Sequence, residues 1–526
     1  MPISRSSSSL LAIRRAASRS ASFAAARRIA PRQSHADFQR YQNARRLLSM
    51  TCVRHTPEAF QPLYKMAPAF YARGSDIVPL YEPCEFYAEL KSRILSAKRR
   101  IFLAALYIGH TEKELVETIR EALRQSDTLQ VEILIDCLRG TRISKAGESS
   151  ATLLLSLIRE FPDQVQVSLY HTPDLTGMLK RALPQRFNEG IGLMHLKLYG
   201  FDDTIMLSGA NLSTDYFTNR QDRYILFDKQ PDITNYYHGL FNVVRRFSYQ
   251  LYQAQSQKVS DEKTLHPGYT LAMLPGVHDP VRHSRQFRAQ ARENLLSFIA
   301  RNTNHERTNV RPEEDTVVLP VIQMGPFNIR QDELMTLKLL DMANRATEQW
   351  TIDLTSGYFN FTDKYKAWIL RTKAAFRFLT AAPEANGFFN SRGVSRFLPP
   401  AYTWIEKQFY KQARRAGRSE DITIKEYSRP GWTYHAKGMW VSLPGENHPT
   451  LTMIGSPNFG HRSSERDLEA QAVVITKNDE LRSAFKKEIE HLNAYSTLVS
   501  TETFAQQDRR VPYGVRVATA MIKTML

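Results

Sequence analysis

The sequence predicts an α/β fold made of two duplicated halves, each a mixed β-sheet flanked by helices. Three observations predict it. The chain has 526 residues, which is too long for one ordinary hydrophobic core. Strand-like and helical segments alternate along it from about residue 80 onward. A short pattern, H-x-K, begins at His195 and again at His435, and features after each copy recur in register.

The first half is predicted to span residues 80–255. Apolar residues recur at helical spacing in three segments, and short apolar or alternating runs typical of strands separate them. The predicted helices are residues 85–99, 112–125 and 150–161, and the predicted strands are residues 100–108, 130–138, 165–172 and 193–201.

The second half, predicted at residues 321–500, repeats this order. Its predicted helices are residues 333–346, 364–374 and 401–416, and its predicted strands are residues 350–360, 376–384 and 422–428. Between the halves, residues 256–320 are richer in Pro, Gly and His, which predicts a connector. Residues 51–79 are predicted as an N-terminal extension and 501–526 as a C-terminal tail. The tail's last residues suit an amphipathic helix on a membrane surface or an ordinary packing helix.

Residues 1–50 have the composition of a mitochondrial transit peptide, with a processing site near Ser49. They hold ten Arg, no Lys and one acid, Asp37. This segment therefore supplies half of the formal net charge of +18, and the rest is spread along the chain.

Composition argues against several other classes of protein. A hydrophobic content of 42% is ordinary for a globular chain and argues against general disorder. The three cysteines, Cys52, Cys84 and Cys137, lack C-x-x-C spacing, so neither a disulfide framework nor a structural zinc site is expected. After the N-terminal segment, no window approaches the roughly 18 apolar residues of a membrane span.

The two H-x-K segments carry the chemistry. At strand spacing, His195 and Lys197 share one face, and so do His435 and Lys437. An imidazole can attack phosphorus or relay a proton, and an adjacent ammonium binds phosphoryl oxygens. One such pair is usually a solvated strand face, so a single copy would be weak evidence for a phosphate site.

The features that follow each pair strengthen the prediction. A turn that contains glycine brings Asn211 in the first half, after Gly209, and Asn458 in the second, after Gly455. An acid, Asp222 or Glu469, stands eleven positions after each asparagine. The two Asn and Ser456 would donate to phosphoryl oxygens, and each acid would orient a histidine. Two such sets that face each other supply a nucleophile and a general acid, so we expect one active site at the interface of the halves.

These residues resemble the phospholipase D superfamily, whose signature is H-x-K-x4-D followed by a Gly-rich turn with Asn. Asp202 completes the first signature, and Ser442 replaces the aspartate of the second. The strings "HAKGMW", "IGSPNFG", "ERDLEAQ" and "LTAAPEANGFF" more closely resemble the mitochondrial phosphatidylglycerophosphate synthases, a family within it. One smaller departure is Ala210 in the first turn.

The resemblance implies transfer of a phosphatidyl group from CDP-diacylglycerol to sn-glycerol-3-phosphate, a step toward phosphatidylglycerol and cardiolipin. His195 would be the nucleophile and His435 the general acid and base. By the same resemblance, Glu469 would orient His195 and Asp222 would orient His435. The catalytic set that it implies is His195, Lys197, Asp202, His435 and Lys437, with oxygens held by Asn211 and Asn458.

Further expectations concern ligands and location. Arg139, Arg142 and Arg392 follow predicted strands, where they could bind substrate phosphates or stand exposed without a ligand. No metal or cofactor is expected, because the lysines supply the positive charge that a metal would bring. We expect peripheral attachment to an anionic membrane, on the matrix face of the mitochondrial inner membrane, and we make no prediction of oligomeric state.

Three other functions remain open. A phosphatidylserine synthase would use serine as the acceptor. A nucleic-acid phosphodiesterase on the same scaffold would suit the basic charge and the missing second aspartate, although half of the excess charge lies in residues 1–50 and no basic stripe with interleaved aromatics is present, so no nucleic acid is expected. A non-catalytic membrane scaffold would not need the intact H-x-K pairs.

Overall fold

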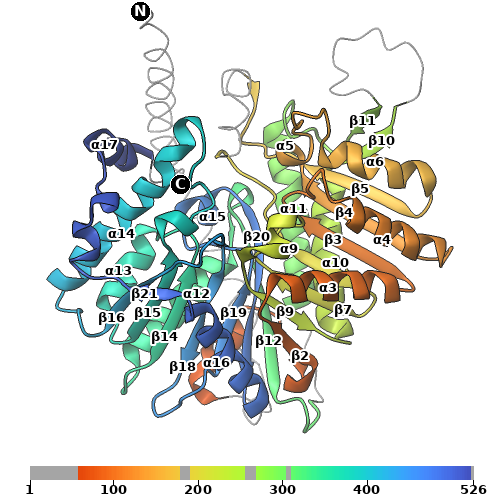
Figure 1. Ribbon diagram of the computed structural model, residues 1–526. Helices are drawn as coiled ribbons and strands as arrows, with labels where there is room; N and C mark the ends of the chain where they lie inside the picture. Colours follow the sequence, from red (N-terminus) through yellow and green to blue (C-terminus); the bar gives the residue numbers. More distant parts are fainter. Residues whose placement is uncertain (1–56, 178–189, 255–267, 304–309, 523–526) are drawn as a thin grey trace, which may run out of the picture.

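The computed structural model describes residues 57–177, 190–254, 268–303 and 310–522. The predicted transit peptide, its processing site and Cys52 lie outside the described residues, as do parts of the predicted connector and the end of the tail. Two large β-sheets stand beside each other, with helices on their outer faces and between them (Figure 1). The predicted α/β fold with two mixed sheets is confirmed.

The first sheet combines parallel and antiparallel strands. β3, β4 and β5 are parallel neighbours, and the strands on either side of them pair antiparallel. The order across the sheet is β11 (Tyr269–Ala272), β10 (Tyr249–Gln253), β5 (Val165–Tyr170), β4 (Gln130–Asp136), β3 (Arg100–Ala105), β6 (Leu198–Phe201), β7 (Thr204–Ser208), β9 (Tyr224–Phe227) and β2 (Ile77–Leu80).

The second sheet repeats this plan. Seven of its strands, β16-β15-β14-β18-β19-β20-β12, match β5-β4-β3-β6-β7-β9-β2 of the first sheet in position and connection. Its order is β1 (Phe70–Ala72), β12 (Thr316–Met324), β20 (Leu468–Thr476), β19 (Leu451–Gly455), β18 (Lys437–Ser442), β14 (Thr351–Ser356), β15 (Ala375–Ala381), β16 (Ile422–Tyr427) and β21 (Ser496–Leu498), with β13 (Ile329–Arg330) beside β12.

Helices divide the molecule into layers. One core lies between the first sheet and α3 (Pro83–Ser96), α4 (Lys113–Arg124) and α6 (Ser150–Glu160). A second lies between the other sheet and α12 (Gln331–Arg345), α13 (Asp363–Arg371) and α14 (Leu398–Arg415). The third joins the inner faces of both sheets through α10 (Pro231–Arg246), α11 (Ser284–Thr303) and α16 (Asp479–Asn493). A strand that is covered on both faces has apolar residues at consecutive positions, and this explains the short apolar runs in the sequence.

The sheets extend past the predicted limits of the halves. β10 and β11 continue the first sheet to Ala272, inside the predicted connector, which also contains α11. The predicted extension at residues 51–79 supplies an edge strand to each sheet, since β1 pairs with β12 and β2 pairs with β9. The N-terminal segment therefore ties the two halves together.

The C-terminal tail forms a helix, α17 (Tyr513–Ile522), that packs on the start of α14. Val511 and Val515 contact Ala401, with Trp404 beside them. Across the described ranges, no helix is both long and apolar enough to cross a membrane.

One arginine of the first half is buried in the second. Arg223, beside β9, is 1% exposed and pairs with Glu488 of α16, Nε to Oε1 at 2.8 Å and Nη2 to Oε2 at 3.0 Å. Its Nη1 donates to Met453 O at 2.7 Å, and the guanidinium lies 3.8 Å from the Trp440 ring centroid. Gly438, at φ +133°, leaves room for it, because a Cβ there would lie 2.1 Å from Nη1.

We expect Glu488→Ala to lower the free energy of unfolding by about 3–5 kcal/mol, because Arg223 would stay buried without its counter-charge. The denaturant midpoint of unfolding measures this loss. Glu313→Ala is the matched control: its ion pair with Arg73 is 3.1 Å long but about half exposed, so water screens it and the midpoint should hardly move. Equal midpoints for the two variants would contradict the assignment.

Candidate active site

Each histidine motif is held by backbone hydrogen bonds to the opposite half. His195 N donates to Leu468 O at 2.9 Å, and Leu468 N donates to Leu193 O at 2.9 Å. In the second half, β17 (Thr433–Tyr434) pairs with β8 (Arg220–Gln221), and His435 N donates to Gln221 O at 2.8 Å. The strand predicted at residues 193–201 joins the first sheet only from Leu198, because residues 193–195 pair across the interface.

This exchange brings each histidine to an acid of the other half. His195 Nδ1 lies 2.9 Å from Glu469 Oε2, and His435 Nδ1 lies 2.6 Å from Asp222 Oδ2. In each ring, Nδ1 therefore faces a carboxylate, and Nε2 points away from that carboxylate. The structure places each acid with the histidine predicted for it. All four side chains are buried.

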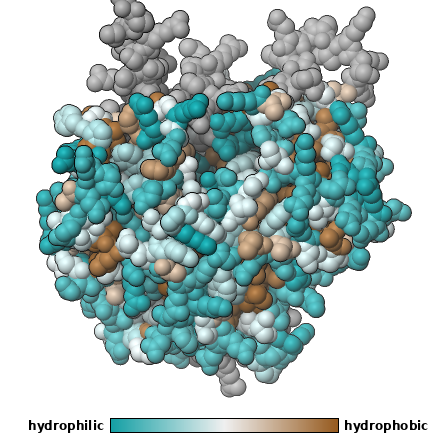
Figure 2. Space-filling view, viewed as in Figure 1, coloured by the Kyte–Doolittle hydropathy of each residue, from teal (hydrophilic) through white to brown (hydrophobic). Residues whose placement is uncertain are grey.

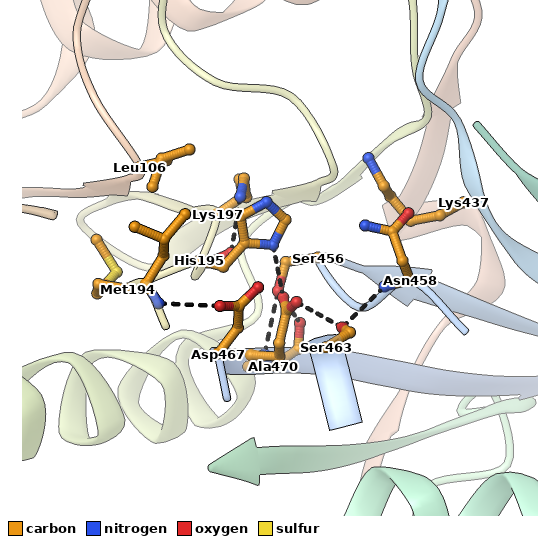
Figure 3. Close-up of polar contacts among 12 residues, drawn as sticks. Leu106, Met194, His195, Lys197, Lys437, Ser456, Asn458, Ser463, Asp467 and Ala470 are labelled. Atoms are coloured by element: carbon orange, nitrogen blue, oxygen red, sulfur yellow. Dashed lines mark hydrogen bonds and ion pairs between the residues drawn. The ribbon is translucent and has the colours of Figure 1, made fainter. Parts of the chain in front are cut away.

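Both lysines lie within the same cluster. Lys437 Nζ is 2.6 Å from His435 Nδ1 and 3.4 Å from Asp222 Oδ2, and Lys197 Nζ donates to His195 O at 2.8 Å. Figure 3 shows Lys197 and Lys437 on either side of the His195 ring. Gly209 of the first turn admits Lys437, because a Cβ there would lie 2.7 Å from its Nζ. The motif glycine is thus required by a side chain of the other half.

The two motif asparagines have different surroundings. Asn211 Oδ1 accepts from Leu106 N at 3.2 Å, and its Nδ2 donates to Tyr216 Oη at 3.1 Å. Asn458 lies beside Lys437 (Figure 3), and its Oδ1 is buried without a hydrogen-bond partner. An unpaired buried amide oxygen of this kind is available to a ligand.

Ser456 stands behind the cluster. Its Oγ accepts from Ala470 N at 3.2 Å and lies 3.3 Å from Ala470 O (Figure 3). Its contacts are with the backbone that carries Glu469, so its position suits support of that acid better than the predicted donation to phosphoryl oxygens.

Two residues of the site were not predicted from the sequence. Tyr216, in the short helix α9 (Thr214–Thr218), places Oη 3.5 Å from His435 Nε2. Ser463, in the short helix α15 (His461–Glu465), donates to Glu469 Oε1 at 2.6 Å. Each stands five positions after the motif asparagine of its half. Alignment of the two halves beyond the asparagines would have singled out this position.

Burial sets the protonation of the cluster. Burial, followed by the neighbouring lysine, lowers the pKa of His195 well below its usual value and that of His435 to about 3. Burial also lowers the pKa of both lysines. Burial alone would raise the pKa of Asp222, but Lys437 and His435 reverse this and the net shift is downward. Burial raises the pKa of Glu469 despite Lys197.

A group of possible metal ligands falls within this cluster. Donor atoms of His195, Asp467 and Glu469 lie within 4.8 Å of one another. Each already has a partner: Asp467 accepts from Leu193 N at 2.9 Å and from Arg462 Nε at 2.9 Å, and the other two pair with each other. The buried Lys197 also faces these acids. The arrangement therefore favours orientation of the imidazole over binding of a divalent cation.

Asp202 is not brought to the histidines. It follows β6 at φ +49°, where its carboxylate accepts from the backbone N–H groups of Lys98, Arg99 and Arg100 at 2.9, 2.8 and 3.0 Å. It thus fixes the start of β3, a position that suits a structural role for the motif aspartate. Ser442, its counterpart, lies opposite Thr351 at the start of β14. Ser442 is the last residue of β18, whereas His435 lies just before the first. The missing second aspartate therefore affects the end of the strand that is away from His435.

The three predicted arginines lie after strands of the two sheets. Arg139 belongs to the short helix α5 (Cys137–Gly140), which follows β4, and its guanidinium lies 4.5 Å from the ring centroid of Tyr107, whose Oη lies 3.4 Å from Ser213 Oγ. Arg142 follows shortly after α5, and Arg392 precedes the short helix η7 (Gly393–Phe397). None of the three has a described contact with either histidine.

Comparison with known proteins identifies relatives over most of the chain. A family profile described as "Cardiolipin synthase, PLD-like domain" matches residues 90–244. The chain is 41% identical to the mitochondrial CDP-diacylglycerol–glycerol-3-phosphate 3-phosphatidyltransferase of Gallus gallus over 486 residues, which cover 88% of this chain and 86% of the relative. The enzyme of the same name from Homo sapiens is also 41% identical, with 88% and 85% covered.

A solved structure shares the fold. The crystal structure of phosphatidylserine synthase from Haemophilus influenzae matches with a TM-score of 0.67 at 18% identity, covering 89% of this chain and 99% of that one. At this level of identity the likeness concerns the fold alone.

Asp202→Ala should weaken the fold and spare the chemistry. Three backbone N–H groups would lose their acceptor, so we expect a loss of about 1–3 kcal/mol in the free energy of unfolding, while turnover per folded molecule changes less than twofold. Ser442→Asp is the reciprocal variant, and it should not increase turnover. A loss in turnover for Asp202→Ala as large as that of a histidine variant would contradict this interpretation.

The buried histidines predict a pH dependence of stability. The pKa of His435 is about 3 in the folded protein and about 6.5 in the unfolded chain, so the unfolded state binds more protons between these values. Stability should therefore fall as the pH falls below about 6.5, by up to about 1.4 kcal/mol per pH unit from this group. We expect His435→Gln to flatten the plot of urea midpoint against pH. A urea midpoint that falls with pH as steeply in His435→Gln as in the wild type would contradict this interpretation.

Proposed function

The chain belongs to the family of mitochondrial CDP-diacylglycerol–glycerol-3-phosphate 3-phosphatidyltransferases, and we propose that its two-histidine site carries out that transfer. The enzyme moves the phosphatidyl group of CDP-diacylglycerol to sn-glycerol-3-phosphate and releases CMP. The observation that carries the assignment of the site is the reciprocal pairing of His195 with Glu469 and of His435 with Asp222 across the interface.

In the first step, His195 Nε2 attacks the phosphatidyl phosphorus. A P–N bond forms, the bond from phosphorus to the CMP oxygen breaks, and His435 Nε2 gives its proton to that oxygen. Glu469 accepts a hydrogen bond from Nδ1–H of His195 and stabilises the positive charge that develops on the ring. Burial supports this role, since it keeps the His195 imidazole neutral and therefore nucleophilic.

In the second step, His435 Nε2 takes the proton from a hydroxyl of glycerol-3-phosphate. That oxygen attacks the phosphorus, and the P–N bond to His195 breaks. Asp222, held ionised by Lys437 and His435, stabilises the imidazolium that forms. Tyr216, 3.5 Å from the same nitrogen, limits the direction in which the His435 ring can turn.

The lysines and asparagines hold the transferred phosphoryl group. Lys197 and Lys437 bring two ammonium groups to the histidines. The side-chain amide nitrogens of the asparagines are the further donors that we propose for the phosphoryl oxygens. The negative pyrophosphate of the donor would raise the pKa of His435 once bound. His435 would then carry its proton at the moment the leaving group needs it.

Acceptor choice requires a group that binds the second phosphate. We propose Arg139, which lies beside Tyr107, together with Arg142 and Arg392 for this role. The enzyme is mitochondrial, and we place it on the matrix face of the inner membrane, in contact with anionic lipid. The predicted transit peptide at residues 1–50 would deliver it there.

A radiolabel assay tests the function. We expect micellar CDP-diacylglycerol to give product with glycerol-3-phosphate and not with serine or water. His435→Ala should slow turnover by about 10²–10⁴-fold, because a general acid and base is lost, and His195→Ala should abolish it. Labelled phosphatidyl group should be trapped on the wild type and on His435→Ala, but not on His195→Ala.

His238→Ala is the matched control for this assay. His238 Nε2 also lies 2.7 Å from a carboxylate, Glu132 Oε2, but this pair stands on α10 and β4 outside the histidine cluster. Its loss should leave turnover within about twofold. Product with serine in place of glycerol-3-phosphate would overturn the acceptor assignment, and label on His195→Ala would overturn the nucleophile.

A further inference from the structure

Five large apolar side chains are exposed around the start of α14. Two belong to α17, and three belong to the loop that leads into α14, which includes η7. We call them the rim surface: Phe389, Val394, Phe397, Tyr513 and Val517, which are 48, 55, 39, 79 and 44% exposed. Exposed apolar groups gathered in one place usually mark an interaction site.

The two segments meet at one end of one helix. η7 runs directly into α14 at Leu398. Val515 of α17 packs on Ala401 in the first turn of α14, and Arg516 lies 4.9 Å from the Trp404 ring centroid one turn on. Figure 1 shows α17 against the upper end of α14, and in Figure 2 brown and teal atoms alternate along this upper left rim.

The charge around the rim surface is positive. Residues 386–404 and 510–520, which lead into α14 and form α17, contain four Arg and no acid. Arg396 lies 4.7 Å from the Phe397 ring centroid. The pKa of Lys407 is lowered by burial and then by the nearby charges of Lys411 and Arg516, which shows how close these cations stand.

The rim surface borders the histidine site. Phe388, in the same loop, contacts Tyr358 with 6.0 Å between ring centroids, and Tyr358 lies at the same distance from the His435 ring. A Cβ built on Gly387 would lie 3.7 Å from both Tyr358 Oη and an Arg220 guanidinium nitrogen. Tyr358 therefore connects the loop that carries part of the rim surface to His435.

We propose that the rim surface docks the enzyme on a bilayer that contains anionic lipid. The apolar side chains would enter the interface, and the arginines and lysines would bind the lipid phosphates around them. This proposal rests on the proposed function, because a diacylglycerol substrate stays anchored in a bilayer while its pyrophosphate must reach His195 and His435. The mixture of apolar and basic groups favours a bilayer over a second copy of this equally basic chain.

Flotation with vesicles of phosphatidylcholine, with or without phosphatidylglycerol, tests the docking. We expect Phe397→Ser/Val517→Ser to bind at least tenfold more weakly than the wild type to the anionic vesicles. The matched control is Val78→Ser/Leu296→Ser, which removes two apolar side chains, each 39% exposed, on β2 and α11. The control should float like the wild type.

A second variant and a soluble substrate separate the possible failures. Val394→Ser/Tyr513→Ser should show the same loss of flotation, so misfolding of one variant cannot decide the outcome. Short-chain CDP-diacylglycerol below its micellar concentration should be converted equally by wild type and rim variants. If none of them converted the substrate, the proposed function would be overturned. The flotation experiment would still test the docking surface by itself.

Equal flotation of wild type and rim variants would overturn the docking surface. So would a rim variant that floats normally but changes the oligomeric state in sedimentation, because the rim would then be an interface between copies. Loss of flotation in the control as well as in the rim variants would show a general dependence on exposed apolar area and would also overturn the assignment.

Discussion

The geometry of the site depends on two sets of backbone hydrogen bonds between the halves. Residues 193–195 pair with Leu468, and Tyr434 and His435 pair with Gln221. In both places the residue after the pairing point is an acid, so the hydrogen bonds that join the halves also set a carboxylate against an imidazole. Neither half by itself pairs its motif histidine with an acid, since each motif histidine contacts the acid of the other half. Docking of the halves and assembly of the site are therefore one event.

A buried ion pair holds this arrangement. Arg223 follows Asp222 directly and reaches into the second half, where Glu488 and the carbonyl of Met453 bind its guanidinium. A charge this deeply buried is costly unless its geometry is complete, so the pair specifies one docking position and few alternatives. Since Arg223 and Asp222 are neighbours, any shift of the arginine would move the acid that orients His435. The structural and chemical parts of the interface are thus adjacent residues.

The two halves have diverged around a shared plan. At the position five residues after the motif asparagine, one half carries Tyr216 and the other Ser463. The tyrosine faces the second histidine, while the serine supports the acid of the first. The pKa of Asp222 is lowered and that of Glu469 is raised. Two equal histidines would have no basis for dividing nucleophile from acid, and these differences distinguish the surroundings of the two.

The sequence by itself determined the duplicated α/β plan, because alternating apolar periods and a pattern repeated in register survive in one dimension. It also determined which residues would meet: His195, Lys197, His435, Lys437 and the two acids. Only the tertiary structure decided how they meet. Arg223, Tyr216 and Ser463 act through contacts with residues far away in the chain, and no local spacing reports such contacts. Asp202 belonged to the motif by spacing, yet the fold turns its carboxylate to the backbone at the start of β3. Residues of one motif are close in the sequence, but the sheet places His195 and Asp202 at opposite ends of the same strand segment.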